Sequence, residues 1–267
     1  MVRVAMAISL CAGVATPALS DVAKGIEALE AGNVQGAATE FQSAFETGDA
    51  DGAFYLGRLF EMGLGTEKDM RRAAELYAAA VSKQSALAQN RLGLMHLNGE
   101  FVLQDYQRAA ELICAAADQG EPNGQFNCGL LYSQGKGVAP DAARAVGYWQ
   151  EAAKANHVAA INYLGQAYQR GTGIDQDATA AFATFQRTAA AGNPMGLHEL
   201  AKAYASGRGV DRDLVKAHGY ANLAAVRGLD EARLLRDELA GMLDAASLEM
   251  AQAFARDWKA VPLDQAG

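Results

Sequence analysis

A 36-residue period runs through most of this chain and constrains its fold more than any other feature. Shifting the sequence along itself, from Gly63 to Gly99, brings the same residue types into register repeatedly. One column holds glycine in five successive copies: Gly63, Gly99, Gly135, Gly171 and Gly207. Another holds aspartate six residues further on: Asp69, Asp105, Asp141, Asp177 and Asp213. Such self-similarity predicts that each copy is one supersecondary unit and that five units stack over residues 49–228.

Each copy has the pattern of two helices. In the first copy, Gly52, Leu56 and Leu59 recur at the spacing of one helical face, which predicts a first helix. The shared glycine is suited to end that helix because it readily adopts the left-handed conformation. The shared aspartate is suited to begin the second helix because its carboxylate can accept free N–H groups of the first turn. A lone helix pair cannot bury both faces, so we predict an all-α αα-repeat solenoid, wound as a right-handed superhelix.

The segments on either side of the repeats have weaker patterns. Residues 21–48 have the pattern of a shorter, degenerate helix pair, with Gly25, Leu29 and Phe41 as apolar or small positions. Residues 229–267 lack the glycine turn and carry denser charge. We expect capping helices and a tail there, because the end of a solenoid needs a polar outer face.

The first twenty residues have the composition of a signal peptide. Arg3 supplies a positive charge, an apolar stretch covers residues 4–14, and Ala18 and Ser20 are small residues before a cleavage point at Asp21. The apolar stretch is shorter than the roughly 20 residues that a membrane-spanning helix needs. We therefore expect an exported protein with no integral membrane segment after cleavage of residues 1–20. The periplasm is the expected location, and secretion is the alternative.

The charge and the histidine pattern restrict the partners. A formal net charge of −8 repels nucleic acid and anionic lipid headgroups, so neither is expected as a partner. With 51% hydrophobic residues, the chain has enough apolar side chains to build a packed core. We predict no cofactor and no metal, because none of the four histidines has the i, i+4 ligand partner of a helical zinc site. These histidines are His96, His157, His198 and His218.

Two of the copies carry a motif that resembles a known family. One copy has Leu164, Gly165, Tyr168, Gly171, Gly173, Ile174 and Asp177, and the other has Gly135, Gly137, Val138, Asp141, Ala145, Tyr148, Trp149, Ala152 and Ala153. The motif is similar to the Sel-one-like repeat, a subclass of tetratricopeptide-like αα repeats, and the resemblance covers residues 49–228. It implies adaptors and scaffolds in signalling, envelope assembly and secretion, often exported in bacteria. The second copy departs from the motif at Phe101, which replaces the second turn glycine, and the fourth has Phe182 and Phe185 as its helix aromatics.

Two cysteines, Cys114 and Cys128, lie seven residues either side of Glu121, at the turn between the second and third copies. Antiparallel helices bring such symmetric positions together, and exported relatives in this family are similar in joining neighbouring helices through cysteines. Against a bridge, Cys114 falls in a column of polar residues that is expected to face solvent. The sequence leaves open whether the two are bridged or remain separate small residues.

One coincidence of sequence points to catalysis. Ser133 and Lys136 match the Ser-x-x-Lys pattern of penicillin-recognising enzymes. In those enzymes the serine opens a helix and partner motifs follow, whereas Ser133 is expected at the end of a helix and no Lys-Thr-Gly motif is present. We therefore predict that the chain is not an enzyme. A cell-wall or beta-lactam-related hydrolase or binding protein is the alternative function.

The face of the first helix opposite its buried stripe is the expected binding surface, because stacked repeats present these helices along a concave side. The candidate contact residues are Phe54, Arg58, Leu94, Leu97, Phe126, Leu130, Gln166 and Lys202. The apolar members would form an exposed patch of the kind that marks a partner site. Alternatively, the superhelix curls enough to bury them against neighbouring helices.

The sequence as a whole predicts an adaptor or scaffold of the bacterial envelope that binds a protein or a peptide. Self-association through the ends of the solenoid is a further hypothesis.

Overall fold

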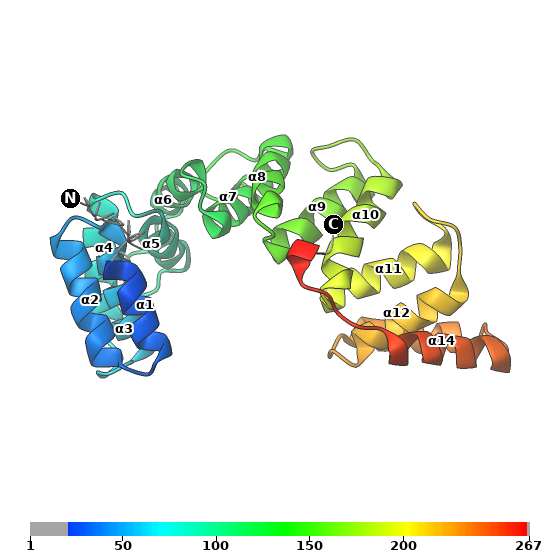
Figure 1. Ribbon diagram of the computed structural model, residues 1–267. Helices are drawn as coiled ribbons and strands as arrows, with labels where there is room; N and C mark the ends of the chain where they lie inside the picture. The colour runs from blue at the N-terminus through cyan, green and yellow to red at the C-terminus, as the bar shows by residue number, and fades with distance from the viewer. Residues whose placement is uncertain (1–20, 266–267) are drawn as a thin grey trace, which may run out of the picture.

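The structure is a computed structural model that describes residues 21–265 (Figure 1). These residues form fourteen α-helices and one short 3-10 helix. They are α1 (Asp21–Glu30), α2 (Val34–Glu46), α3 (Ala50–Met62), α4 (Met70–Ser82), α5 (Ala86–Asn98), α6 (Tyr106–Asp118), α7 (Pro122–Gln134), α8 (Ala142–Lys154), α9 (Val158–Arg170), α10 (Ala178–Ala190), α11 (Pro194–Ser206), α12 (Leu214–Ala225), α13 (Asp230–Ala240), α14 (Ala245–Asp257) and η1 (Leu263–Gln265). The predicted signal peptide, residues 1–20, lies outside the described residues.

Successive helices pair in chain order, and the pairs stack on one another. The five repeats are α3 with α4, α5 with α6, α7 with α8, α9 with α10, and α11 with α12. The pair α1 and α2 precedes them, and α13 and α14 pack against α12. Figure 1 shows the pairs following one another along an arc from α1 to α14. The prediction of an all-α repeat solenoid is confirmed.

The turn inside each repeat is built as its residue columns predict. Each first helix ends at the shared glycine, whose φ lies between 66° at Gly135 and 72° at Gly207. Each second helix begins at the shared aspartate, as at Asp69, whose carboxylate accepts the backbone N–H of Arg72 at 2.9 Å. The backbone N–H of the same aspartate donates to the carbonyl of Phe60, on the last turn of α3, at 3.0 Å. Equivalent bonds close the other four turns, so glycine and aspartate together fix the angle between the helices.

A second turn glycine makes room for the neighbouring repeat. Gly137 has a φ of +73°, and a Cβ atom there would collide with the backbone carbonyl of Tyr106 at the start of α6. In the second repeat this position is Phe101, which keeps the left-handed conformation with a φ of +60°. Its ring is 62% exposed. Phe101 therefore leaves the backbone conformation of the turn unchanged. It adds an exposed aromatic side chain to the turn of the second repeat.

Glycine on each first helix faces a large side chain on the second helix. A Cβ at Gly129 would overlap the ring of Trp149, and one at Gly165 would overlap the ring of Phe185. In the fifth repeat the same column holds Ala201, and its counterpart on α12 is also alanine. A larger residue on the first helix is thus matched by a smaller one on the second.

No helix between residues 21 and 265 is both long enough and apolar enough to cross a membrane.

Candidate partner-binding surface

The apolar members of the predicted binding face are half-buried between repeats. Leu94 and Leu97 pack against a core cluster that contains Ile113 and Leu131. Phe126 and Leu130 pack against the next cluster, which is built around Trp149 and Ile161. The sequence left open whether these four side chains form an exposed patch or pack against neighbouring helices. In the structure they pack against neighbouring helices. The reason is that the first helices of successive repeats contact each other, as α5 does α7, so each covers part of the next.

The aromatic members of this face are also occupied. The ring of Phe126 stacks on His157 at a centroid distance of 4.8 Å and meets Tyr163 edge-on at 5.4 Å. Phe54 is half-buried against Tyr55 and Tyr77. These rings serve packing between helices and leave little area for a partner.

In the first two repeats, Arg58 and Arg91 both pair with the carboxylate of Glu61. Glu61 accepts from Arg58 at 2.9 Å, from Arg91 of the next repeat at 2.5 Å, and from the hydroxyl of Tyr77. Burial opposes ionisation of Glu61, but the hydrogen bonds from Arg91 and Tyr77 outweigh it and hold its pKa below the usual value. Burial and the adjoining Glu61 carboxylate raise the pKa of Tyr77. Arg58 therefore pairs within its own helix, and Arg91 makes the contact between repeats one and two.

Amide side chains connect further repeats. Asn127 donates to Asn90 at 2.9 Å, and Asn162 donates to Asn193 at 3.1 Å. The hydroxyl of Thr188 donates to Asn162 at 2.8 Å, deep in the core. These bonds satisfy buried polar groups across the junctions, so the asparagines set the register of the solenoid.

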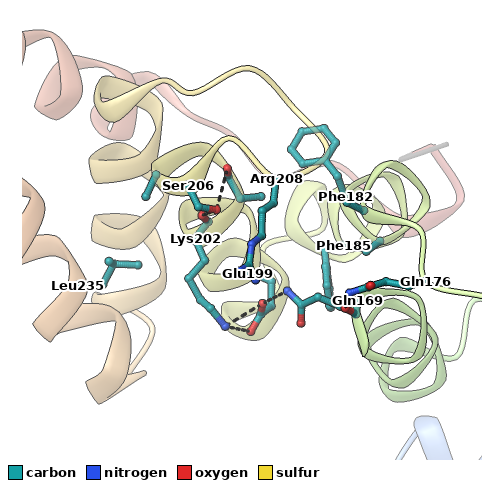
Figure 2. A pocket seen from close by; sticks show the side chains of 13 residues that line it. Gln169, Gln176, Phe182, Phe185, Glu199, Lys202, Ser206, Arg208 and Leu235 are labelled. Atoms are coloured by element: carbon teal, nitrogen blue, oxygen red, sulfur yellow. Dashed lines mark hydrogen bonds and ion pairs between the residues drawn. The ribbon is translucent and has the colours of Figure 1, made fainter. Parts of the chain in front are cut away.

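A cleft opens on the same face between the fourth and fifth repeats, where the predicted surface is polar (Figure 2). It encloses about 680 Å³ between α10 and α11, and Leu235 of α13 also lines it. Phe185 is buried at its base, and Phe182 is half-buried beside it. Figure 2 shows Leu235 on one side, the two phenylalanines on the other, and Lys202 and Glu199 between them. Of the predicted contact residues, Lys202 lines this cleft, whereas Gln166 is half-buried on α9 outside it.

Polar groups on the cleft wall are partly committed to one another. The side chain of Glu199 is only 8% exposed and accepts from Lys202 at 2.9 and 3.0 Å and from Gln169 at 3.0 Å. Gln176 donates to the backbone carbonyl of Gln169 at 2.9 Å. The guanidinium of Arg208, in contrast, is exposed and makes no hydrogen bond or ion pair with any described residue. The cleft thus combines an apolar base with one cation that is free to bind a ligand.

Of the residues that line this cleft, the sequence predicted only Lys202 as a contact residue; Phe182, Phe185, Glu199 and Arg208 were not predicted as parts of a site. Arg208 occupies a turn column that otherwise holds Leu64, Glu100, Lys136 and Thr172. When the residue type at one repeat position differs in every copy, packing of the repeats does not determine that residue. That variability is the signal by which Arg208 could have been found.

The geometry around Ser133 and Lys136, the Ser-x-x-Lys match, does not support a catalytic role. Ser133 lies on the last turn of α7 and Lys136 in the turn that follows, and both are exposed. Neither side chain makes a hydrogen bond with another described residue. Within residues 21–265, no group of three or more histidine, cysteine, aspartate or glutamate side chains is placed to hold a metal ion.

The two cysteines are joined. A disulfide links Cys114 on α6 to Cys128 on α7, with their Cα atoms 5.1 Å apart. Cys128 is buried, whereas Cys114 is half-buried at the surface. The bridge therefore ties the second repeat to the third, which is the bridged alternative of the two that the sequence left open.

Comparison with known protein families now places the chain. The model of the Sel1 repeat matches residues 50–85, 86–121, 122–157, 158–193 and 194–228. The chain belongs to the Sel1 repeat family. Sel1 repeat proteins act as protein-binding adaptors, and their fold is typically a non-catalytic scaffold.

Solved Sel1 repeat structures share this fold. A Sel1 repeat protein from Oxalobacter formigenes is 23% identical, with a TM-score of 0.75, over 92% of this chain and 100% of that one. The protective antigen c5321 of uropathogenic Escherichia coli is 22% identical, with a TM-score of 0.58, over 89% of this chain and 60% of that one.

One curated relative shares a shorter segment. The ERAD-associated E3 ubiquitin-protein ligase component HRD3B of Arabidopsis thaliana is 44% identical over 57 residues, which is 21% of this chain. The chain spans only 9% of the length of that relative.

Proposed function

We propose that this Sel1 repeat protein is an exported adaptor of the bacterial envelope, and that it binds a protein or peptide in the cleft between α10 and α11. The cleft carries the proposal, because it is open between two repeats and its cation Arg208 has no partner among the described residues. Burial of apolar side chains in such a cleft supplies affinity, and a few polar groups at its edge supply orientation. Other polar residues of this face, such as Arg91, Asn90 and Asn162, help to hold the repeats in register.

Export is supported by two independent features. The composition of residues 1–20 is that of a signal peptide, and the disulfide between Cys114 and Cys128 belongs to oxidising compartments. In a Gram-negative host, the protein should be recovered from the periplasmic fraction with Asp21 as its first residue. Recovery from the cytoplasm with residues 1–20 intact would contradict export.

Binding in the cleft can be tested by crosslinking in the native envelope. A photoreactive phenylalanine analogue at Ser206, which is exposed and lines the cleft, should give a discrete crosslinked partner. The same analogue at Arg71, exposed on α4, is the matched control and should give none. Equal crosslinking from both positions, or from neither, would remove the support for an adaptor that binds through this cleft.

Substitutions at Leu94 and Phe126 are unsuitable for this purpose. Both side chains are half-buried in junctions between repeats, so aspartate at either position would place a charge against the core. Loss of binding in such variants would report loss of folding. Positions at the cleft separate the two effects.

A further inference from the structure

Building on the proposed function, we propose that the cleft recognises an internal acidic–apolar peptide segment. An aromatic or leucine side chain of the partner enters between Phe182 and Leu235, and the carboxylate of an adjoining aspartate or glutamate pairs with Arg208. The proposal names the chemistry of the partner and assigns Arg208 as the residue that selects it.

The walls of the cleft favour an apolar side chain. Ala178, Ala181 and Phe185 are among its lining residues. Figure 2 shows Leu235 of α13 across the cleft from Phe185. Phe182 meets Tyr204 edge-on at 5.4 Å, so its ring is held in place before a partner arrives. A volume of about 680 Å³ accommodates one large side chain with part of its backbone. A rigid apolar wall on both sides lowers the entropy lost on binding.

The charges of the cleft favour one carboxylate. Lys202 is already paired with both oxygens of Glu199, which leaves Arg208 as the unpaired cation among the lining residues. A guanidinium matches the planar geometry of a carboxylate and can bind it through two hydrogen bonds. The full chain carries a formal net charge of −8, which repels densely anionic ligands. A single acidic residue beside an apolar one satisfies both conditions.

The position of the cation favours an internal residue over a chain terminus. Arg208 is exposed, whereas Phe185 is almost fully buried. An apolar side chain that reaches the base leaves its own backbone outside. A carboxylate on the next side chain then stays with the exposed groups of the lining, which include Arg208. Nearer the base, a ligand carboxylate would meet Glu199, which repels it.

The test uses a blocked probe peptide, acetyl-Ser-Gly-Phe-Glu-Gly-Ser-amide, titrated into the purified protein with binding followed by NMR chemical shifts. Peptides with glutamine or lysine in place of the glutamate are the chemical controls. We expect the glutamate probe to bind about two- to fivefold more tightly than the glutamine probe, as one exposed ion pair allows. Shifts should concentrate on the residues of the cleft.

Charge reversal makes the test specific. Arg208→Glu should invert the preference, so that the lysine probe binds more tightly than the glutamate probe. Lys136→Glu is the matched control, because Lys136 occupies the same turn position in the third repeat, is exposed and lies outside the cleft. This control variant should bind all three probes as the wild type does. Circular dichroism of both variants verifies that the solenoid remains folded.

Three outcomes would overturn the inference: equal affinity for the glutamate and glutamine probes, an unchanged preference in Arg208→Glu, or tighter binding of a probe that ends in Phe with a free carboxylate. Its failure is distinguishable from failure of the proposed function. Specific crosslinking from Ser206 without a preference for the acidic probe would retain the adaptor and refute the acidic–apolar partner.

Discussion

At the scale of single residues, glycine has two different roles in this solenoid. Gly137 is required because its φ is positive and the carbonyl of Tyr106 occupies the place of a Cβ atom. Gly147, inside α8, has no atom within 4 Å of the place where its Cβ would stand. The first glycine is thus fixed by the neighbouring repeat, whereas the second is not fixed by any contact among the described residues.

Alanine substitutions should separate these roles. Gly137→Ala is expected to lower the free energy of unfolding by about 2–3 kcal/mol, because it combines backbone strain with a steric collision. Gly147→Ala is expected to raise it by about 0.5–1 kcal/mol, the usual difference between glycine and alanine inside a helix. Urea denaturation followed by circular dichroism measures both. Equal effects would show that the turn can move away from α6.

A second prediction at this scale concerns Glu61. Its pKa is lowered in the folded state, so its contribution to stability is present above the ordinary value of 4.5 and is lost as the pH falls through the lowered pKa. Glu61→Gln should lower stability at pH 7 by about 2 kcal/mol, since Arg91 loses a charged partner. The difference from wild type should shrink in denaturation curves recorded at successively lower pH. A difference that stays constant down to pH 2 would assign the effect to packing alone.

At the scale of helices and turns, each feature that was predicted correctly depends on residues close together in sequence. The glycine that ends α3 and the aspartate that begins α4 act within their own turn, so one copy of the repeat is sufficient to identify them. The exposure of Leu94 was not predictable in this way, because it depends on how closely α5 approaches its neighbours. The cleft was even harder to predict from the sequence, because the residues that line it come from two repeats and, with Leu235, from α13.

The bridge between α6 and α7 should stabilise the molecule measurably. Cys114 and Cys128 are 14 residues apart, and closing a loop of this size in the unfolded chain corresponds to about 3 kcal/mol. Reduction should therefore lower the urea midpoint of the wild type. The double variant Cys114→Ala/Cys128→Ala should have a low midpoint with or without reductant. A wild-type midpoint unaffected by verified reduction would contradict this expectation.

At the scale of the whole molecule, contacts are almost entirely between neighbouring pairs of helices. A molecule of this kind depends on its ends, because an internal pair is covered on both sides and a terminal pair on one only. The pair α13 and α14 covers the last repeat, where Leu239 is 2% exposed against Ala217 and Ala221. That residues 229–267 cap the solenoid stays a prediction, which their removal would test.

Removal of residues 229–267 should expose that apolar face. We expect the truncated protein to associate in a concentration-dependent manner, because the uncovered face of α12 is complementary to apolar faces of other copies. Sedimentation velocity at several concentrations distinguishes this from the behaviour of the full chain. A truncated protein that remains monomeric and equally stable would mean that the last repeat needs no cover.

The disulfide also changes how the chain would respond to mechanical force. When the two ends are pulled apart, tension passes through the bond between Cys114 and Cys128, so the residues between them never bear load. The fully stretched molecule is then shorter by about 45 Å than its reduced form, given about 3.5 Å for each withheld residue. Force spectroscopy with and without reductant would record this difference in length. The two arms of the solenoid could each be extended, while the junction between repeats two and three would remain covalently joined.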